Sequence, residues 1–544
     1  MASTNLSPDD ANDLRRKLET AFADFHGGCM GEAAKACRAI LGQTPEQPDA
    51  LHLMAMIAYR MNRLELALQL FDQTVRVAPN LAQAWSNRAL VLRLFGRRDE
   101  ALVSGQNAIA HDPKLASGWD ITGQMLREKR RYEDAVHHHA RAVALDPASA
   151  MFHNNYAVAL VALHDYDAAW GAATKAAALA PEMAGAQMTL ANILAATGHF
   201  EESLAHYRHA HSLDAKLADA TASEGRVHFL FGEFAEGWRC MEQRAFDRER
   251  FASLPRWQGE KTGHLLLYAE QGIGDVIMFL RYLPLIAGRA DSITLQAPAA
   301  LKSLIAAHFP VLPLIAPDDP LPPADAFGLL MSVPYFLGTT LENVPAPIPY
   351  IEAREEWRAP WRARLEPAAK PRIGIVWAGN PKYANDHVRS LSPALIEPLM
   401  AKYGAHLVAL QKDAAAPPKD KGLFDAAPWL DDFTSTAGLI AELDLVISVD
   451  TAVAHLAGAM GKPVWILIPY SPDWRWMLVR EDSPWYPTAR LFRQETPGDW
   501  PSALAALSAE LGKFLAGDRT VLQPTPWRGK PARAPRKTYE LPGN

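Results

Sequence analysis

The sequence predicts an α-helical solenoid in its first half and two doubly wound α/β lobes in its second half. In the first half, a proline recurs every 34 residues. In the second half, short apolar runs of strand length alternate with helical stretches. Because 544 residues are too many for one hydrophobic core, several structural units are expected.

Several residue types share the 34-residue period. The columns are Pro45, Pro79, Pro113, Pro147 and Pro181; Ala33, Ala67, Ala101, Ala135 and Ala169; Ala108, Ala142, Ala176 and Ala210; and, with gaps, Gly28, Gly96, Gly198 and Gly232. Trp85 and Trp119 share a further column near a helix start. Small alanines let antiparallel helices approach closely, glycine permits the turn between them, and proline precedes the next pair.

By this period and these columns, residues 14–248 resemble the tetratricopeptide repeat family, with residues 1–13 expected to be a flexible N-terminus. Such arrays form a curved solenoid whose concave face binds partners. Asn87 and Asn155 occupy the same repeat position, and an amide side chain matches both groups of an extended peptide backbone. They are therefore candidate acceptor-binding residues for a protein partner. The alternative is that both are ordinary solvated side chains.

Six apolar runs predict strands in the second half: Leu265–Tyr268, Ile293–Gln296, Ile373–Trp377, Leu407–Gln411, Leu445–Val449 and Val464–Ile468. Continuous apolar runs favour strands buried on both faces, and hence parallel sheets flanked by helices. The Pro-rich stretch Pro310–Pro349 is interpreted as the end of a first lobe (262–350), before a second lobe (371–520). The two lobes are expected to bind ligands in the cleft at the carboxyl ends of their strands.

The first lobe opens with a glycine-containing turn that follows a strand. Gly272 and Gly274 let the backbone turn sharply and approach a ligand. Asp275 then lies at a helix start beside the cleft, where simple helix capping is the alternative role.

Polar residues follow the strands of the second lobe, and they are candidates for binding a diphosphate. They are Asn380, Lys382, Arg389 and Ser390 after one strand, and Asp450, Thr451 and Ala452 after another. Cations and hydroxyls suit phosphate oxygens, and a helix start favours an anion. His455 lies one turn inside that helix, where a packed histidine is the alternative.

Together these motifs resemble the GT-B glycosyltransferases of the heptosyltransferase group, over residues 263–517. The resemblance rests on the turn Gly272–Asp275 and on the pattern Asp450-Thr451-x-x-x-His455, followed by small residues and Gly461-Lys462-Pro463. It implies two Rossmann-like lobes, Asp275 as the catalytic carboxylate, and a donor diphosphate held by the Asp450–His455 turn. It also implies that Gln411 and Lys412 lie near the nucleotide base or ribose.

A long repeat arm joined to such lobes resembles the O-linked N-acetylglucosamine transferases and the bacterial flagellin glycosyltransferases. This likeness implies transfer of a sugar from a nucleotide-sugar donor to Ser or Thr of a protein acceptor held by the arm. Flagellin and a nonulosonic acid such as pseudaminic acid are the implied acceptor and sugar. A glycan- or lipid-directed enzyme, and a non-enzymatic repeat scaffold with a decayed transferase region, stay open as alternatives.

In the expected mechanism, Asp275 accepts the acceptor proton. Arg389, Lys382 and the helix start at Thr451 stabilise the leaving phosphate. The chain has a single Asp-x-Asp, Asp165–Asp167, and it lies inside a repeat. The sequence therefore predicts transfer without a metal and without a cofactor beyond the nucleotide-sugar co-substrate.

Net charge, cysteine spacing and the length of the apolar runs argue against a nucleic-acid-binding, disulfide-linked or membrane-spanning protein. A net charge of −6 gives no basic surface for nucleic acid. The three cysteines, Cys29, Cys37 and Cys240, form no Cys-x-x-Cys pair. With no signal-peptide pattern and only strand-sized apolar runs, a cytoplasmic protein that does not span a membrane is expected. Residues 521–544 are rich in proline and basic residues, and they are predicted to be a disordered tail.

Overall fold

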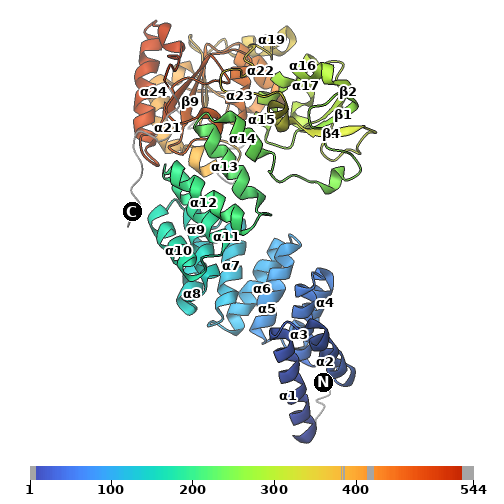
Figure 1. Cartoon of the computed structure of the whole chain (residues 1–544). Helices are drawn as coiled ribbons and strands as arrows, with labels where there is room; N and C mark the ends of the chain where they lie inside the picture. Colours follow the sequence, from blue (N-terminus) through green and yellow to red (C-terminus); the bar gives the residue numbers. More distant parts are fainter. Residues whose placement is uncertain (1–7, 382, 384–385, 413–421, 530–544) are drawn as a thin grey trace. The chain divides into compact units, whose positions relative to one another are not determined.

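A computed structural model of the chain describes residues 8–381, 383, 386–412 and 422–529. The chain divides into two compact units, with the boundary between Ile193 and Leu194. Helices alone occupy the first part of the chain, and the strands all follow them (Figure 1). Among these described residues, no helix combines the length and the apolar character that a membrane span requires.

Paired helices make up the first part of the chain, which confirms the predicted solenoid. The helices are α1 Pro8–His26, α2 Met30–Gln43, α3 Pro48–Arg60, α4 Leu64–Val77, α5 Ala82–Leu94, α6 Arg98–His111, α7 Ala116–Glu128, α8 Tyr132–Leu145, α9 Ala150–Ala162, α10 Tyr166–Leu179, α11 Ala184–Ala196, α12 Phe200–Leu213, α13 Ala218–Leu230 and α14 Phe234–Met241. Small alanines such as Ala67, Ala101 and Ala135 are fully buried, as expected where two helices pack closely.

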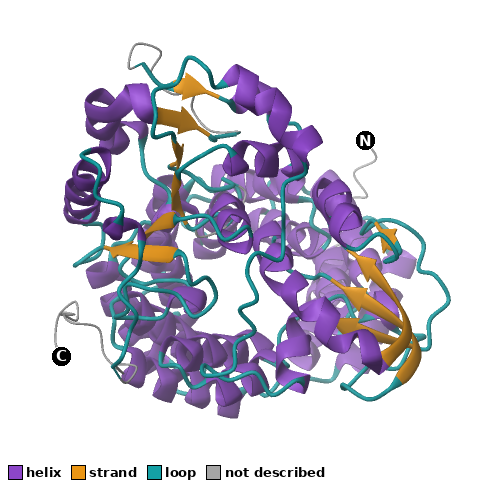
Figure 2. Cartoon of the chain, turned by 90° about the horizontal axis from the view of Figure 1, so that it is seen from above, coloured by secondary structure: helices purple, strands orange, loops and turns teal. Residues whose placement is uncertain are grey.

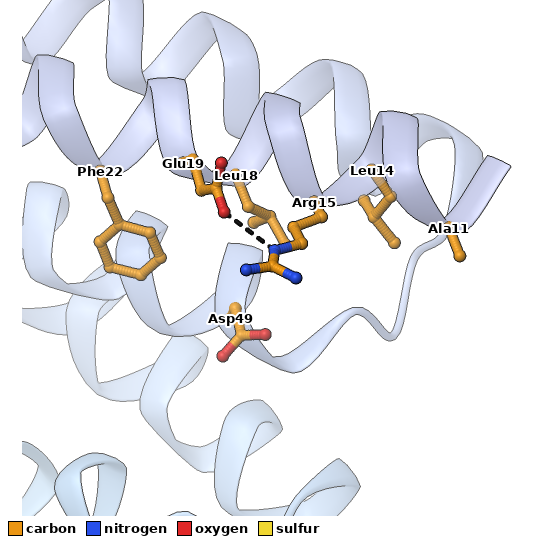
Figure 3. A pocket seen from close by; sticks show the side chains of 7 residues that line it. All are labelled: Ala11, Leu14, Arg15, Leu18, Glu19, Phe22 and Asp49. Carbon is orange, nitrogen blue, oxygen red and sulfur yellow. Dashed lines mark hydrogen bonds and ion pairs between the residues drawn. The ribbon is translucent and has the colours of Figure 1, made fainter. Parts of the chain in front are cut away.

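The first helix starts earlier than the sequence predicted. Residues 1–13 were expected to be flexible, but α1 begins at Pro8, where proline suits the first helical position. Leu14, Leu18 and Phe22 then follow at helical spacing and line one side of a hollow of about 340 Å³ near Asp49 of α3 (Figure 3). An apolar stripe at this spacing favours an amphipathic helix, which accounts for the early start of α1.

The column that contains Trp85 and Trp119 has a structural role in the repeats. The indole Nε1 of Trp85 donates to the carbonyl of Pro79 at 2.7 Å, and Trp119 donates to Pro113 at 2.9 Å. In the next repeat His153 makes the same contact with the carbonyl of Pro147, at 3.1 Å. Each of these side chains ties the start of a repeat to the proline turn that precedes it.

The turn inside every helix pair contains one residue in the left-handed conformation. The φ angles are 81° at Gly28, 56° at Asn62, 70° at Gly96, 61° at Arg130, 60° at His164, 89° at Gly198 and 78° at Gly232. These positions are 34 residues apart, so the glycine column predicted the turn correctly. Three repeats adopt the same turn without glycine, at a conformational cost.

Arg130→Gly should therefore stabilise the repeats by about 1 kcal/mol, because glycine adopts a positive φ without steric strain. Gly96→Ala is the matched reverse change. No atom lies within 4 Å of the added Cβ, so backbone strain alone should destabilise that variant by about 1 kcal/mol. Urea unfolding followed by circular dichroism measures both. A loss of stability in Arg130→Gly would contradict this account of the turn.

Two parallel sheets form the second part of the chain, as expected for the GT-B fold. The first sheet has the order β3-β2-β1-β4 and the second the order β10-β9-β8-β5-β6-β7. The strands are β1 Thr262–Tyr268, β2 Ala290–Gln296, β3 Leu314–Ile315, β4 Ala326–Leu329, β5 Ile373–Val376, β6 Leu407–Ala409, β7 Phe424–Asp425, β8 Leu445–Val449, β9 Val464–Ile468 and β10 Ala489–Arg493. Every pair within the two sheets is parallel.

Helices surround both sheets, and the two groups of strands are separate in Figure 2. The helices are α15 Ile273–Phe279, α16 Leu283–Ile286, α17 Lys302–His308, α18 Val333–Phe336, α19 Glu355–Arg364, α20 Asp386–Arg389, α21 Pro393–Tyr403, α22 Phe433–Ala441, α23 Ala452–Ala459 and α24 Trp500–Leu515. In both sheets the strand order reverses direction, beside β1 and between β5 and β8. Ligands of open α/β folds bind at such reversals.

The Pro-rich stretch Pro310–Pro349 contains more structure than the sequence predicted. It holds the buried strand β4, which pairs with β1 over Leu265–Tyr268, and the short strand β3. The sequence prediction missed β4 because it is only four residues long, contains Gly328 and lacks a periodic pattern. The stretch completes the first sheet as well as leading to the second lobe.

The last repeats belong to the second unit, which begins at Leu194 and not after residue 248. The Trp238 ring of α14 lies 5.6 Å from Trp474 and 6.2 Å from Phe279, and its Nε1 donates to the carbonyl of Thr339 at 3.1 Å. Phe229 of α13 also packs against Trp474, with ring centroids 4.5 Å apart. The final helix pair is thus part of the hydrophobic core of the lobes.

The segment predicted as a disordered tail, 521–544, is ordered in its first part. Val521 is buried in the core of the second lobe, and the Trp527 backbone N–H donates to Asp482 at 3.0 Å. Burial of Val521 and this hydrogen bond explain the difference. The rest of that prediction, residues 530–544, lies outside the described residues.

Candidate active site

Asp275 lies at the start of α15, which follows β1 through the turn at Gly272. Its Oδ2 accepts a hydrogen bond from the backbone N–H of Gly272 at 3.0 Å. This contact is the helix-capping role that the sequence left open. The other oxygen, Oδ1, forms an ion pair with Arg475 of the second lobe. Asp275 therefore faces the second lobe.

Arg475 connects carboxylates of both lobes. It belongs to the short 3-10 helix η8, Trp474–Trp476, after β9. Besides Asp275, its guanidinium contacts Asp473 Oδ1 at 2.5 Å, and it stacks over the Trp474 ring at 4.4 Å. The Arg475 side chain is 9% exposed, so water screens these contacts little.

Asp450 and His455 lie next to this pair. Asp450 follows β8, and its Oδ1 lies 3.6 Å from His455 Nε2. Burial opposes ionisation of Asp450, but the hydrogen bond and charge of His455 lower its pKa. His455 Nδ1 lies 2.9 Å from the hydroxyl of Tyr486, and its ring stacks on Trp476. His455 is thus both packed and in contact with a carboxylate.

Helices α15 and α23, one from each lobe, pack against each other at this site. A Cβ on Gly274 would lie 2.6 Å from His455 Cδ2, which is too close for an ordinary contact. Gly274 therefore allows the start of α15 to touch the His455 ring. The lack of a side chain at Gly274 is therefore required for close packing at the interface between the lobes.

Gly274→Ala should destabilise the second unit by about 1–3 kcal/mol, because the added methyl group overpacks this contact. Gly288→Ala is the control, since no atom lies within 4 Å of its added Cβ. Thermal unfolding of both variants tests the contact. Equal effects of the two substitutions would contradict a tight fit at Gly274.

Arg389 and Ser390 lie at the end of α20, after β5. Arg389 Nε donates to Asp386 at 3.1 Å, and its charge acts on Asp450 and Asp473. Ser390 Oγ accepts from the Gly379 backbone at 2.8 Å and donates to Asp386 at 2.8 Å. Asp386 thus orients both side chains.

The remaining predicted donor-binding residues of the second lobe have different surroundings. Gln411 holds the ends of β5 and β6 together, because its side chain bonds to the backbone of Trp377, Ala378 and Lys412. Lys412 Nζ donates to the carbonyl of Leu430 at 2.6 Å. Asn380 is exposed. The prediction for Lys382 lies outside the described residues.

Thr451 and Ala452 are placed as the sequence predicted, at the start of α23. Thr451 is the residue before the helix, and its side chain makes no capping hydrogen bond. Its Oγ1 lies 2.9 Å from Ser448 Oγ. The first backbone N–H groups of α23, from Ala452 on, therefore remain available at this edge of the sheet.

Sequence reasoning missed three charged residues of this site: Asp473, Arg475 and Arg226. The signal for the first two was their place just after β9, at the carboxyl end of a buried strand. Arg226 comes from α13 of the last repeat pair, donates to Ser223 at 2.6 Å, and its charge acts on Asp473 and Arg475. No sequence pattern indicated that a charge on a repeat helix acts on this site.

Burial, and secondly the like charge of Asp450, raises the pKa of Asp473 to about 7. As pH rises from about 4 to about 7, the unfolded chain releases this proton while the folded protein retains it, so the group makes the folded protein less stable over that range.

Asp473→Asn removes this penalty. The unfolding temperature of the variant relative to wild type should therefore increase between about pH 4 and about pH 7 and stay constant above that range. Thermal unfolding of both proteins across this range tests the prediction. A difference that does not change with pH would mean that Arg475 keeps Asp473 ionised.

The candidate acceptor-binding residues Asn87 and Asn155 lie in the first unit. Asn155 Nδ2 donates to both oxygens of Asp120, at 3.0 and 3.1 Å. Asn87 Oδ1 accepts from Gln83 at 3.3 Å, and its Nδ2 lies 3.4 Å from His52 Nε2. Both amides already have partners within the repeats, so a bound peptide would have to replace or share these contacts.

A second hollow, of about 480 Å³, lies in the second unit away from the ion pair. It is lined by Ser303, Ala306, Ala307, Pro310, Arg354, Glu356, Trp357, Asp432 and Thr434. None of the predicted site residues lines it. The candidate site is therefore defined by its charged side chains and the reversal in strand order.

Comparison with known families agrees with this division of the chain. Residues 427–495 match the family described as "Glycosyltransferase family 9 (heptosyltransferase)". Residues 52–116 and 122–184 match the family described as "Tetratricopeptide repeat". The chain is thus similar to tetratricopeptide repeats over part of its first half and to glycosyltransferase family 9 over part of its second lobe. The family 9 match includes Asp450, His455, Asp473 and Arg475.

Protein FlbA of Caulobacter vibrioides is 29% identical over 340 residues, which cover 55% of this chain and 56% of that protein. The chain thus spans about half the length of the curated relative that it matches. Among solved structures, a thermophilic tetratricopeptide-repeat protein of Thermus thermophilus is 21% identical, covering 32% of this chain and 96% of its own, with a TM-score of 0.29. A tetratricopeptide repeat protein from Parabacteroides merdae is 14% identical, covering 44% and 97%, with a TM-score of 0.36.

Proposed function

We propose that the protein transfers a sugar from a nucleotide-sugar donor to Ser or Thr of a protein acceptor. One observation carries this proposal: the Asp275 carboxylate of the first lobe meets Arg475 of the second lobe beside Asp450 and His455. A carboxylate opposite cationic groups suits a reaction in which a hydroxyl attacks and a phosphate leaves. The family 9 match supports the glycosyl-transfer class.

Asp275 is the proposed general base. The acceptor hydroxyl attacks the anomeric carbon of the donor, the bond from that carbon to the phosphate oxygen breaks, and the hydroxyl proton passes to Asp275. Before donor binds, both Asp275 oxygens are engaged, one by the Gly272 N–H and one by Arg475. An arriving diphosphate competes for Arg475 and frees Oδ1, because guanidinium binds phosphate oxygens strongly.

The leaving nucleotide phosphate is stabilised by Arg389, Arg475 and the start of α23 at Thr451 and Ala452. Arginine donors and helix N-terminal N–H groups both favour developing negative charge. Arg226 adds a third arginine near Asp473. With these groups carrying the charge, we expect transfer to proceed at the same rate with or without added Mg²⁺ or Mn²⁺.

The acceptor is proposed to be a protein bound by the repeats, with flagellin or a similar surface protein as the first candidate. Tetratricopeptide arrays present extended surfaces that bind protein segments, and the sequence resembles the flagellin glycosyltransferases. The proposed sugar, a nonulosonic acid such as pseudaminic acid, rests on that resemblance alone. A cytoplasmic location and nucleotide-sugar supply from the cytoplasm are parts of the same proposal.

Asp275→Asn should reduce transfer by about 10²–10⁴-fold, because the amide cannot accept the proton. Asp291→Asn, on the exposed part of β2 in the same lobe, is the matched control and should retain full activity. Intact-mass analysis of flagellin and other surface proteins, from cells that carry each variant or lack the gene, measures the modification.

Full modification with Asp275→Asn would end the general-base assignment. If flagellin and the other surface proteins have the same masses in wild-type cells and in cells that lack the gene, the protein-acceptor proposal is wrong. A change confined to cell-surface glycans would then favour the glycan-directed alternative.

A further inference from the structure

A compact group of metal-ligating side chains lies in the last helix pair, apart from the residues used above. Glu224 and His228 are one turn apart on α13, and Cys240 faces them from α14. One potential ligand atom from each lies within 4.8 Å of the other two, and all three residues are buried. Among the residues that the structure describes, this mixed carboxylate, imidazole and thiol group is the metal-ligand candidate.

We propose that Glu224, His228 and Cys240 form a binding site for a zinc-like divalent cation that links α13 to α14. Zinc accepts oxygen, nitrogen and sulfur ligands at about 2.0–2.3 Å, which places tetrahedral ligand atoms roughly 3.3–3.8 Å apart. Glu224 Oε1 and His228 Nε2 are 3.5 Å apart, so they already match this spacing. Three protein ligands leave a fourth position for water.

Glu233 orients the His228 ring through the ring nitrogen that does not face Glu224. His228 Nδ1 lies 2.6 Å from Glu233 Oε2, so the N–H on that side points to a carboxylate and Nε2 turns toward Glu224. A carboxylate that holds the outer nitrogen is the usual arrangement around metal-binding histidines, where it fixes the tautomer and raises ligand basicity.

The backbone brings Cys240 close to the other ligands. A Cβ on Gly225 would lie 2.8 Å from Cys240 Cβ, so glycine at this position lets α14 approach the face that carries Glu224 and His228. The Cys240 thiol accepts a weak contact from the Arg239 guanidinium at 3.8 Å, and Arg239 also pairs with the exposed Glu236. Among the described residues, the buried Cys240 thiol therefore has only this weak contact beside Glu224 and His228.

The Arg208 guanidinium must move away from Glu224 before a divalent cation can bind there. Arg208 Nε contacts Glu224 Oε1 at 2.7 Å, and its Nη2 lies 3.5 Å from His228 Nε2. The Arg208 side chain is 58% exposed while that of Glu224 is 10% exposed, so the guanidinium can move into solvent when a divalent ion neutralises Glu224. When the sulfur–metal bond forms, the thiol proton of Cys240 passes to solvent.

Co²⁺ is the probe for this site, because a cobalt–thiolate bond gives a near-ultraviolet charge-transfer band. Full-length protein should bind one Co²⁺ with that band, and Zn²⁺ should displace it. Cys240→Ser should lose the band. Cys37→Ser should retain it, because Cys37 is a buried cysteine of α2 and is not one of the three proposed ligands. Circular dichroism checks that both variants fold.

Two further variants separate a metal site from an ordinary buried ion network. Arg208→Gln should tighten Zn²⁺ binding, because it removes the competing cation, and Glu233→Gln should weaken it by about 10–100-fold. Absence of Co²⁺ binding, persistence of the band in folded Cys240→Ser, or weaker Zn²⁺ binding by Arg208→Gln would each overturn the proposal. None of these readouts depends on transferase activity.

Discussion

Trp238 occupies the point where the last repeat meets both lobes. Its ring packs against Phe279 at the end of α15 and against Trp474 at the start of η8. Asp275 lies at the other end of α15, and Arg475 directly follows Trp474. The same buried indole therefore fixes the two short elements that carry the ion pair between the lobes. A fully buried aromatic side chain contributes several kcal/mol through burial and packing, enough to hold both elements in place.

The repeat architecture could be predicted from the sequence because its signal is periodic. Pro45, Pro79 and Pro113 keep their spacing, and each turn repeats the same backbone conformation. The turn at Gly272–Asp275 could also be predicted, because the glycines and the carboxylate are local to one strand end. In both cases, neighbouring residues in the chain determine the structure, so a pattern is visible without coordinates.

Features that depend on contacts between residues distant in the sequence could not be predicted from it. The Asp275–Arg475 pair joins residues of different lobes, and the charge of Arg226, on a repeat helix, acts on Asp473. Gln411 shows the opposite case. Its place at a strand end fitted nucleotide binding, but its amide bonds to the backbone of Trp377 and Ala378. A strand end brings polar side chains to the ligand edge, yet some of them are needed to satisfy the backbone there.

The position of the boundary at Leu194 limits how this architecture can be rearranged in evolution. Recombination that exchanged repeat arms after residue 248 would separate Phe229 and Trp238 from Trp474, and it would leave large aromatic faces in contact with water. An exchange near Leu194 would preserve these contacts. The final helix pair should therefore be inherited with the two lobes, while the earlier repeats can diverge in number and in sequence.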